Sequence, residues 1–528
     1  MAAAGASQAE VFSYTPATAI VTWNDSIGSS RQGNLAYFRA NADLPTVTLV
    51  SIFSKLLTSL TGLGTLPALQ TLSCQQNLLT SLDVTHNPAL TSLTCNNNLL
   101  TSINVCGNPL LTLLNCSSNV LSSLDVSCSM DLITLLCVNN NLTSLDVSNH
   151  TALVTLACQS NSLLNVLDVS SNTALESLNC SSNVLTSLDI STCTALTSVN
   201  CSTNSITSLS TTNNTSLTSL ICFSNPMTSL DVSASTLLTY LSCHSCSLTT
   251  LNVSANTVLN YFDCHSNSLS SLDVSANTVV TYIYCSDNSL TSFDASSNTI
   301  VALISCEGNP LTSLTLPSTA TLATLSFGDN TTLASVDLSM CSGLQSLTCS
   351  NTTAMTTLDV SFNTAMVFAD ISNTNIANID FSGLSSLTTL LASNTQVGGW
   401  LLDTSSVLST LDVSNSSLLT SVNVPGVSLS SLTVSNCPIL DFLDFNSNLV
   451  SSVDISGCPN LTQVLGYFNT LTVLAVNTIL DKLAGFSISY GYVELSGQTP
   501  SATPTTGPPN GLAAISVLES RTWTIGTD

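Results

Sequence analysis

The chain repeats itself every 21 residues, and this period limits its fold more than any other property of the sequence. A cysteine recurs at this spacing from Cys74 to Cys306, with one interval of 22 residues between Cys158 and Cys180. Three residues beyond nearly every one of these cysteines stands an asparagine, of which Asn77 is the first. A fixed period of about 20–50 residues is typical of architectures in which one short unit is stacked many times.

The segment LTSLDVS, which recurs once per period with small changes, alternates apolar and polar residues. Such alternation predicts a strand whose side chains point in turn to opposite sides, with Leu and Val inward and Ser and Asp outward. A unit this short cannot bury its apolar side alone, so neighbouring units must stack to close a common core. The asparagine column fits an inward amide that hydrogen-bonds the backbone at a bend.

The repeat reads LxxLxCxxNxLxxLDVSxN and resembles the leucine-rich-repeat family, whose motif is LxxLxLxxN/CxL. It is most similar to the short bacterial and viral subtype in which each coil carries that half-motif twice. The resemblance covers residues 52–475 and implies a β-rich solenoid of roughly 20 coils with short parallel strands and little helix. At the second half-motif the asparagine is replaced, as the family permits, by Cys193, Cys341, Cys437 and Cys458.

Five segments are expected along the chain: an N-terminal cap or anchor at 1–51, the repeat solenoid at 52–480, a C-terminal cap at 481–498, a Pro/Thr linker at 499–510 and a tail segment at 511–528. Asp481 to Ser496 is interpreted as a closing strand unit. The linker is too rich in proline to join a strand ladder. The tail segment resembles a short terminal piece of leucine-rich virion and tail proteins of phages.

Five Lys and Arg residues stand against thirty Asp and Glu residues, which gives a formal net charge of −25. Nucleic-acid binding needs clustered cations, and an anionic membrane surface would repel such a chain. The sequence contains no run of about twenty apolar residues, which a membrane span would need. Its N-terminus lacks the features of a Sec signal peptide. We therefore expect that the protein neither binds nucleic acid nor inserts into a membrane. If it works outside its cell of origin, we expect it to leave by a route other than a simple signal peptide, such as release within a virus particle.

The chain has twenty cysteines, a number that first suggests disulfides or metal ligands. The main column occupies the place that leucine holds in the family motif, so its members are expected to be small buried thiols. Cα atoms stacked about 4.8 Å apart also fall within disulfide range, so occasional bridges or a metal remain alternatives. Cys243 and Cys246 are the one close pair, and both are expected to face inward.

A column of aspartates runs from Asp83 to Asp380 on the outward side of the LDVS segments. The simplest interpretation is a solvated acidic stripe. A sharper alternative is a set of weak calcium sites with oxygen ligands, for which the candidates are Asp125, Asp146, Asp168 and Asp189. Paired carboxylates also serve glycoside hydrolysis, but a stripe repeated on every coil has no cleft and no distinct acid. No other cofactor is indicated.

One group of coils carries aromatic and titratable side chains at the outward positions of the strand that ends at each cysteine. Most other coils carry Ser, Thr, Asn or Gln there. Exposed aromatic rings beside polar groups are suited to bind sugar rings or a protein partner. Ordinary variation of the surface is the alternative interpretation. A third is that His244 and His265 share a metal ion. The candidate ligand-binding residues are Phe223, Tyr240, His244, Tyr261, Asp263, His265, Tyr282, Tyr284 and Glu307.

A serine nucleophile needs a base and an orienting acid, and none of the four histidines lies in such a motif, so we expect no enzyme. The leading expectation is a phage virion surface protein, in the tail, baseplate or capsid decoration, that mediates host or glycan adhesion. Its partners would be a protein or glycan on the host surface and other virion proteins. The alternatives are a bacterial extracellular adhesin on the same solenoid and an ice- or mineral-binding solenoid.

Overall fold

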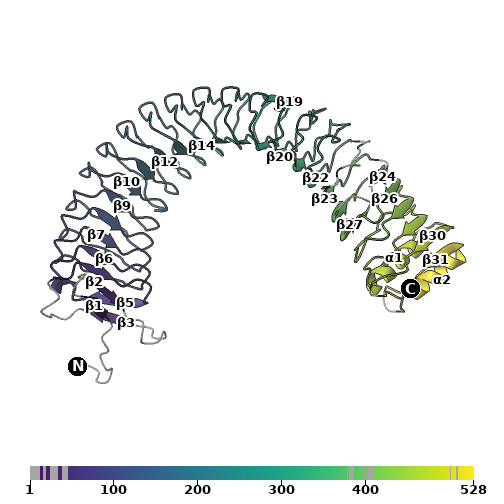
Figure 1. Cartoon of the computed structure of the whole chain (residues 1–528), viewed down its shortest axis with the longest axis horizontal. Helices are drawn as coiled ribbons and strands as arrows, with labels where there is room; N and C mark the ends of the chain where they lie inside the picture. Colours follow the sequence, from purple (N-terminus) through teal and green to yellow (C-terminus); the bar gives the residue numbers. More distant parts are fainter. Residues whose placement is uncertain are drawn as a thin grey trace, which may run out of the picture. The chain divides into compact units, whose positions relative to one another are not determined.

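The structure is a computed structural model that describes residues 46–376, 379, 384, 386–397, 408–499, 501–506 and 509–527, and the backbone alone of 12–15, 20–23, 34–37 and 399–401. Its contacts divide the chain into two units, Met1–Leu259 and Asn260–Asp528. Each unit is a stack of coils in a parallel β-solenoid, and the coils number about 19 in all (Figure 1). The fold that the repeat predicts is therefore confirmed.

In the first unit, each coil contributes one short strand to a parallel sheet, and neighbouring strands pair in register, as Leu156 does with Leu178. β1 is antiparallel to β2, and β2 is parallel to β4. A further parallel pair is formed by β3 (Asn34–Tyr37) and β5 (Leu57–Thr61). The strands of the main sheet are β1 (Phe12–Thr15), β2 (Ile20–Trp23), β4 (Leu49–Ser51), β6 (Thr71–Ser73), β7 (Ser92–Thr94), β8 (Leu113–Asn115), β9 (Thr134–Leu136), β10 (Thr155–Ala157), β11 (Ser177–Asn179), β12 (Ser198–Asn200), β13 (Ser219–Ile221) and β14 (Tyr240–Ser242).

The second unit has the same arrangement, with parallel strands on two sides of its coils. One ladder consists of β15 (Tyr261–Asp263), β16 (Tyr282–Tyr284), β18 (Leu303–Ser305), β20 (Thr324–Ser326), β21 (Ser346–Thr348), β22 (Phe368–Asp370), β23 (Thr389–Leu391), β25 (Thr410–Asp412) and β27 (Ser431–Thr433). A parallel pair is formed by β17 (Ser292–Asp294) and β19 (Ser313–Thr315), and a sheet of six by β24 (Gly399–Leu401), β26 (Ser421–Asn423), β28 (Phe442–Asp444), β29 (Gln463–Leu465), β30 (Gly491–Glu494) and β31 (Trp523–Gly526).

Two helices close the second unit, α1 (Val473–Gly485) and α2 (Gly511–Ser520), which pack on each other (Figure 1). The segment from Asp481 was expected to be a strand unit but begins as the end of α1, and its strand is confined to β30. The reason is the helical spacing of the buried residues Val476, Ile479, Leu480 and Leu483. Neither helix in the described part of the chain has the length and apolar character needed to cross a bilayer.

The core is built from columns of identical or similar side chains, one from each coil. The column from Cys74 to Cys306 is fully buried, and Phe327 and Cys349 continue it. In the LDVS segments the alternation is also as expected, since Leu82 and Val84 are buried whereas Asp83 is exposed. Burial is thus distributed evenly along the chain, and each coil depends on its neighbours for it.

The first asparagine column uses both ends of its amide. Nδ2 of Asn119 donates to the carbonyl oxygens of Cys95 and Cys116 at 3.1 and 3.0 Å. Its Oδ1 accepts the backbone N–H of Leu100 at 2.9 Å. One side chain therefore satisfies polar backbone groups of its own coil and of the preceding coil. Asparagine is suited to this place because its short side chain carries a donor and an acceptor together.

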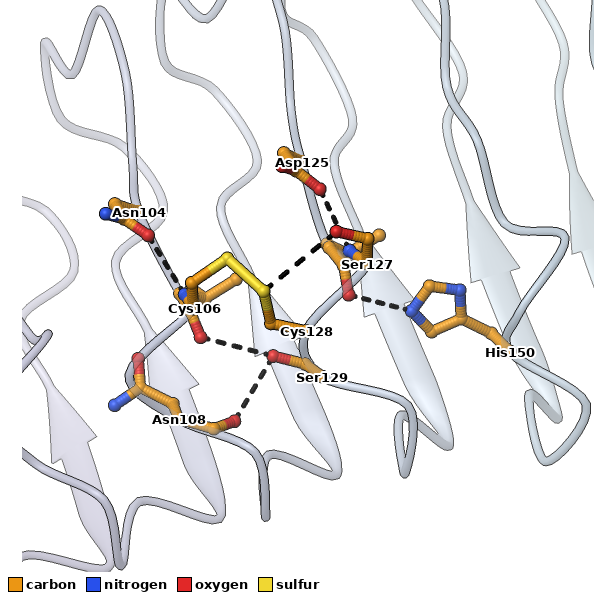
Figure 2. The surroundings of a disulfide bond; sticks show 10 residues. Asn104, Cys106, Asn108, Asp125, Ser127, Cys128, Ser129 and His150 are labelled. Carbon is orange, nitrogen blue, oxygen red and sulfur yellow. Dashed lines mark hydrogen bonds between the residues drawn. A yellow bond between two sulfur atoms is a disulfide. The ribbon is translucent and has the colours of Figure 1, made fainter.

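The second column, at the bend after the LDVS segment, needs a donor alone. Nδ2 of Asn108 donates to the carbonyl oxygens of Val84 and Asn87, both at 2.9 Å. Within the described residues, Oδ1 of Asn108 has no hydrogen-bond partner. In the following coils Ser129 and His150 take this place and contact a backbone carbonyl in the same way (Figure 2).

The difference between the columns explains why cysteine is tolerated in the second. Sγ of Cys193 lies 3.3 Å from the carbonyl oxygen of Val169, and Sγ of Cys458 lies 3.1 Å from that of Val434, as a thiol donor requires. A thiol is a weak donor and a poor acceptor, so it suits a position without an incoming N–H. The family resemblance permits the exchange, and the hydrogen bonds give its physical reason.

We predict that Asn108→Ser and Asn119→Ser differ in stability although the same atoms are removed. Asn108→Ser keeps the needed donor, as Ser129 does one coil later. Asn119→Ser leaves the buried N–H of Leu100 without its acceptor, which costs roughly 1–3 kcal/mol. Urea unfolding of both variants measures the difference, and equal losses would show that the columns do not differ in their demands.

Candidate functional site

The candidate residues lie on the strand face of successive coils, where side chains point away from the core. In the first unit, the ring of Phe223 stacks on that of His244, with centroids 4.3 Å apart and planes 11° from parallel. Tyr240 is the first residue of β14 and is half-buried. The first unit therefore presents an aromatic pair and a tyrosine of its own on this face.

The second unit begins with three tyrosines on the strand face. Tyr261 pairs with Tyr282 in register on β15 and β16, and Tyr284 lies two residues further along β16. The ring of Tyr261 is 6.1 Å from that of Tyr282 and 5.6 Å from that of Tyr284, and the rings are tilted by 45° and 42°. Tyr282 is 40% exposed. The three residues form one aromatic cluster, as the 21-residue period predicts.

Acidic and imidazole groups flank these rings. Asp263 ends β15, and its Oδ1 lies 2.6 Å from Nδ1 of His265 and accepts the backbone N–H of that residue at 3.3 Å. Asp263 was expected to be exposed, but it is buried, and its carboxylate is bonded to His265. The carboxylate of Glu307 accepts a hydrogen bond from Oγ of Ser326.

The hypothesis that His244 and His265 share a metal gains no support. His244 stacks on Phe223 in the first unit, and His265 bonds Asp263 in the second. Among the residues that the structure describes, no group of three or more His, Cys, Asp or Glu side chains is arranged to hold a metal ion.

The aspartate column forms turn caps. In coil after coil, Oδ1 accepts the backbone N–H of the residue two positions later, as in Asp125 with Ser127 at 3.0 Å and Asp168 with Ser170 at 2.9 Å. Hydrogen bonds from the side chain and backbone of that residue lower the pKa of each of these two carboxyls. Asp146 and Asp189 have the same bonds, and Asp380 lies outside the described residues.

Asparagine interchanges with aspartate in this column because the turn needs an acceptor and not a charge. Asn104 accepts the backbone N–H of Cys106 at 2.9 Å, and Asn252 accepts that of Ser254 at 3.0 Å. Local hydrogen bonds of this kind are the usual reason for Asp and Asn at turns. The geometry thus accounts for the column without a cation, and calcium binding stays a prediction.

The buried cysteine column is reduced, as expected. Its members are free thiols, and burial raises the pKa of the Cys74 and Cys116 thiols to about 12. Cys246 was expected to face inward but is only half-buried. It stands in the first asparagine column, and its Sγ lies 3.6 Å from the carbonyl oxygen of Cys222. At this coil the backbone N–H of Met227 bonds the carbonyl oxygen of Asn225, so the thiol is not needed as an acceptor.

One disulfide, between Cys106 and Cys128, joins two neighbouring coils (Figure 2). The cysteines expected to be free thiols were those of the buried columns, and neither Cys106 nor Cys128 belongs to these columns. Cys106 replaces the serine of the LDVS segment, and Cys128 follows it by 22 residues, one more than the period. The two cysteines therefore face each other from neighbouring coils, with their Cα atoms 4.8 Å apart. The signal in the sequence was two cysteines outside every column at nearly one period.

Solved structures of other proteins share this fold, whereas no sequence-family model and no curated protein matches the chain. The functional domain of InlJ from Listeria monocytogenes, which includes a cysteine ladder, is 32% identical, with a TM-score of 0.51 over 67% of this chain and 69% of that chain. YopM from Yersinia enterocolitica is 20% identical (TM-score 0.56, 78% and 87% covered). The Arabidopsis receptor kinase HAESA, in complex with a peptide hormone and co-receptor, is 17% identical (TM-score 0.54, 85% and 87% covered).

These likenesses agree with the repeat, the two polar columns and the parallel strands. The chain belongs to the leucine-rich-repeat family. The two more distant likenesses show the shared fold alone.

We predict that exchange of Asp125, Asp146, Asp168 and Asp189 to Asn preserves the Tm at pH 7, because Asn keeps the acceptor and removes repulsion between neighbouring carboxylates. The pKa values are lowered in the folded state, so the stabilisation they represent is present above the unfolded pKa of about 3.9 and is lost as the pH falls through the folded value. The variant should therefore lose less Tm than the parent between pH 6 and pH 3.

The corresponding exchange to Ala removes the acceptor and should lower the Tm at pH 7. Equal behaviour of the Asn and Ala variants would contradict the role as turn caps. The metal hypothesis is tested by comparing the Tm in millimolar calcium with the Tm in a chelator. If the aspartates bind calcium, the ion raises the Tm of the parent and leaves the Tm of the Asn variant unchanged.

We predict that alkylation of the native, unreduced protein modifies Cys246 first. The other free cysteines are buried, and a thiol that is both inaccessible and protonated reacts slowly. Peptide mapping after timed alkylation at pH 8 measures the order, and a denatured sample gives the control. Fast modification of Cys74 or Cys116 in the native protein would contradict the buried column.

Proposed function

We propose that this protein is a non-enzymatic binding protein of the adhesion type, which engages a protein on a target surface through the start of its second unit. The observation that carries this proposal is the cluster of Tyr261, Tyr282 and Tyr284, named here the tyrosine face. The ring of Tyr261 lies within 6.1 Å of each of the other two rings on the strand face. Corresponding positions of earlier coils carry small polar residues, for example Ser177 and Ser198.

Tyrosine is a good anchor for binding because it presents a large area and a polar tip at low entropic cost. The core lies on the opposite side of these strands and is filled by other side chains, among them Phe262 and Ile283. The family supports a binding role, and HAESA, which has the same fold, is seen with a peptide hormone. A glycan is the second candidate ligand, since tyrosine rings and carboxylates also suit sugars.

An extracellular setting is part of the proposal. The Cys106–Cys128 disulfide supports it, because such bonds persist mainly in oxidising environments. We further propose the surface of a phage virion as the carrier, on the resemblance of residues 511–528 to terminal pieces of phage proteins, with a bacterial cell surface as the alternative. Immunogold labelling of purified particles and of intact cells separates these two carriers.

We predict that the triple variant Tyr261→Ser, Tyr282→Ser, Tyr284→Ser folds normally and loses adhesion. Aromatic anchors each contribute on the order of 2 kcal/mol to binding in a desolvated interface, so the affinity should fall by more than about tenfold. The measurement is the binding of fluorescently labelled full-length protein to intact cells of a bacterial panel. Protease treatment of the cells removes protein receptors, and periodate treatment removes glycans.

Phe368→Ser is the matched control, because Phe368 is the first residue of β22, which belongs to the same ladder, as Tyr261 is of β15 and Tyr282 of β16. It should bind like the parent. If the triple variant also binds like the parent, the tyrosine face is not the adhesion surface.

A further inference from the structure

After Lys55, the coils carry no Lys or Arg side chain before Lys482. Most of the thirty acidic residues of the sequence lie in that interval. The carboxylates of the repeats therefore have no Lys or Arg partner in this stretch of chain and are held by hydrogen bonds from backbone, hydroxyl, amide or imidazole groups, as in Asp125 and Asp263. In the described part of the chain, neither Asp287 nor Glu307 has an ion pair, so a cation from another molecule can pair with them.

Carboxylates gather at one edge of the strands that carry the tyrosine face. Asp263 is the last residue of β15, and Glu307 follows β18 by two residues. Asp287 and Asp329 each follow a strand, β16 and β20, by three residues, and both are exposed. Since parallel strands end at the same edge of a sheet, these acids form a rim beside the tyrosines.

The rings themselves suit a cation. A Lys or Arg group within about 6 Å of a tyrosine ring is attracted by the negative face of the ring, and the attraction grows when water is excluded. The tyrosine rings are tilted by more than 40° and so do not lie flat on one another. Tyr282 is the most exposed of the three.

We propose that the partner of the tyrosine face is a basic protein segment, whose Arg or Lys side chains pack on Tyr261, Tyr282 and Tyr284 while their charges pair with Asp287 and Glu307. This inference rests on the proposed function for the use of this surface and adds the chemistry of the partner. A neutral glycan accounts for the rings but not for the acidic rim. A basic segment accounts for both, and the net charge of −25 accelerates its approach.

The test uses the full-length protein and a fluorescein-labelled hexa-arginine peptide, with hexa-citrulline as its uncharged isostere. Fluorescence anisotropy is measured at 0.15 M salt with EDTA, so that metal ions make no contribution. We expect hexa-arginine to bind and hexa-citrulline to bind at least roughly tenfold more weakly, since charge-assisted contacts are lost.

The triple Tyr→Ser variant keeps the charge of the parent and should bind hexa-arginine roughly tenfold more weakly. Asp287→Asn with Glu307→Gln should weaken it severalfold, and the Gln keeps the acceptor for Ser326. Phe368→Ser is the control, because Phe368 begins β22 in the same ladder and Asp370 ends that strand, as Tyr261 and Asp263 do in β15, and it should bind like the parent.

Two outcomes would overturn the proposal. If the triple Tyr variant binds hexa-arginine as tightly as the parent does, the peptide binds acidic groups of the surface in general and not the tyrosine face. If hexa-citrulline binds as tightly as hexa-arginine, the charge of the peptide makes no contribution. Cell binding separates this failure from failure of the proposed function. If the triple Tyr variant loses cell binding while the Asp287/Glu307 variant retains it and hexa-arginine does not compete, the surface is an adhesion site for a partner that is not basic.

Discussion

The fold depends on hydrogen bonds from inward side chains to the backbone at the two bends of every coil. A coil of 21 residues turns the chain too sharply for strand pairing to satisfy all its polar groups, and a buried unpaired group costs roughly 1–3 kcal/mol. Asn119 resolves this at one bend with bonds to its own coil and to the preceding one, and Asn108 resolves it at the other bend with two bonds to the preceding coil. The same bonds therefore close a coil and tie it to its neighbour, which makes the stack cooperative from coil to coil.

This arrangement leaves the outer side of the coils free to vary under other demands. The aspartates are held in place by their own turns, which is why Asn104 can stand among them. The tyrosines at the start of the second unit have no such local role, since neither the turns nor the core requires a ring there. A feature that the fold does not need is a better indication of function than one that recurs in every coil.

Charge gives the chain a second distinguishing property. Hydrogen bonds to turns stabilise the carboxylates one by one, and these short-range bonds replace the Lys and Arg partners that the coils lack. The long-range negative potential is consequently left uncompensated, and at physiological salt it acts over about 8 Å. Such a surface repels nucleic acid and anionic membranes and attracts basic segments, so the composition and the tyrosine face point to the same kind of partner.

The sequence by itself determined the repeat, the parallel strands in register, the buried cysteine column and the positions of both polar columns, because a fixed period with alternating polarity admits one way of stacking. It also placed Tyr261, Tyr282 and Tyr284 in one cluster, since residues 21 apart lie in adjacent coils. Only the tertiary structure decided what depends on distances across coils or on competition between local patterns. Cys106 and Cys128 bond because a diagonal offset brings them together. Asp263 is buried with its carboxylate bonded to His265, which its outward position in the alternation did not predict. The segment at Asp481 completes a helix because its apolar side chains find a buried face.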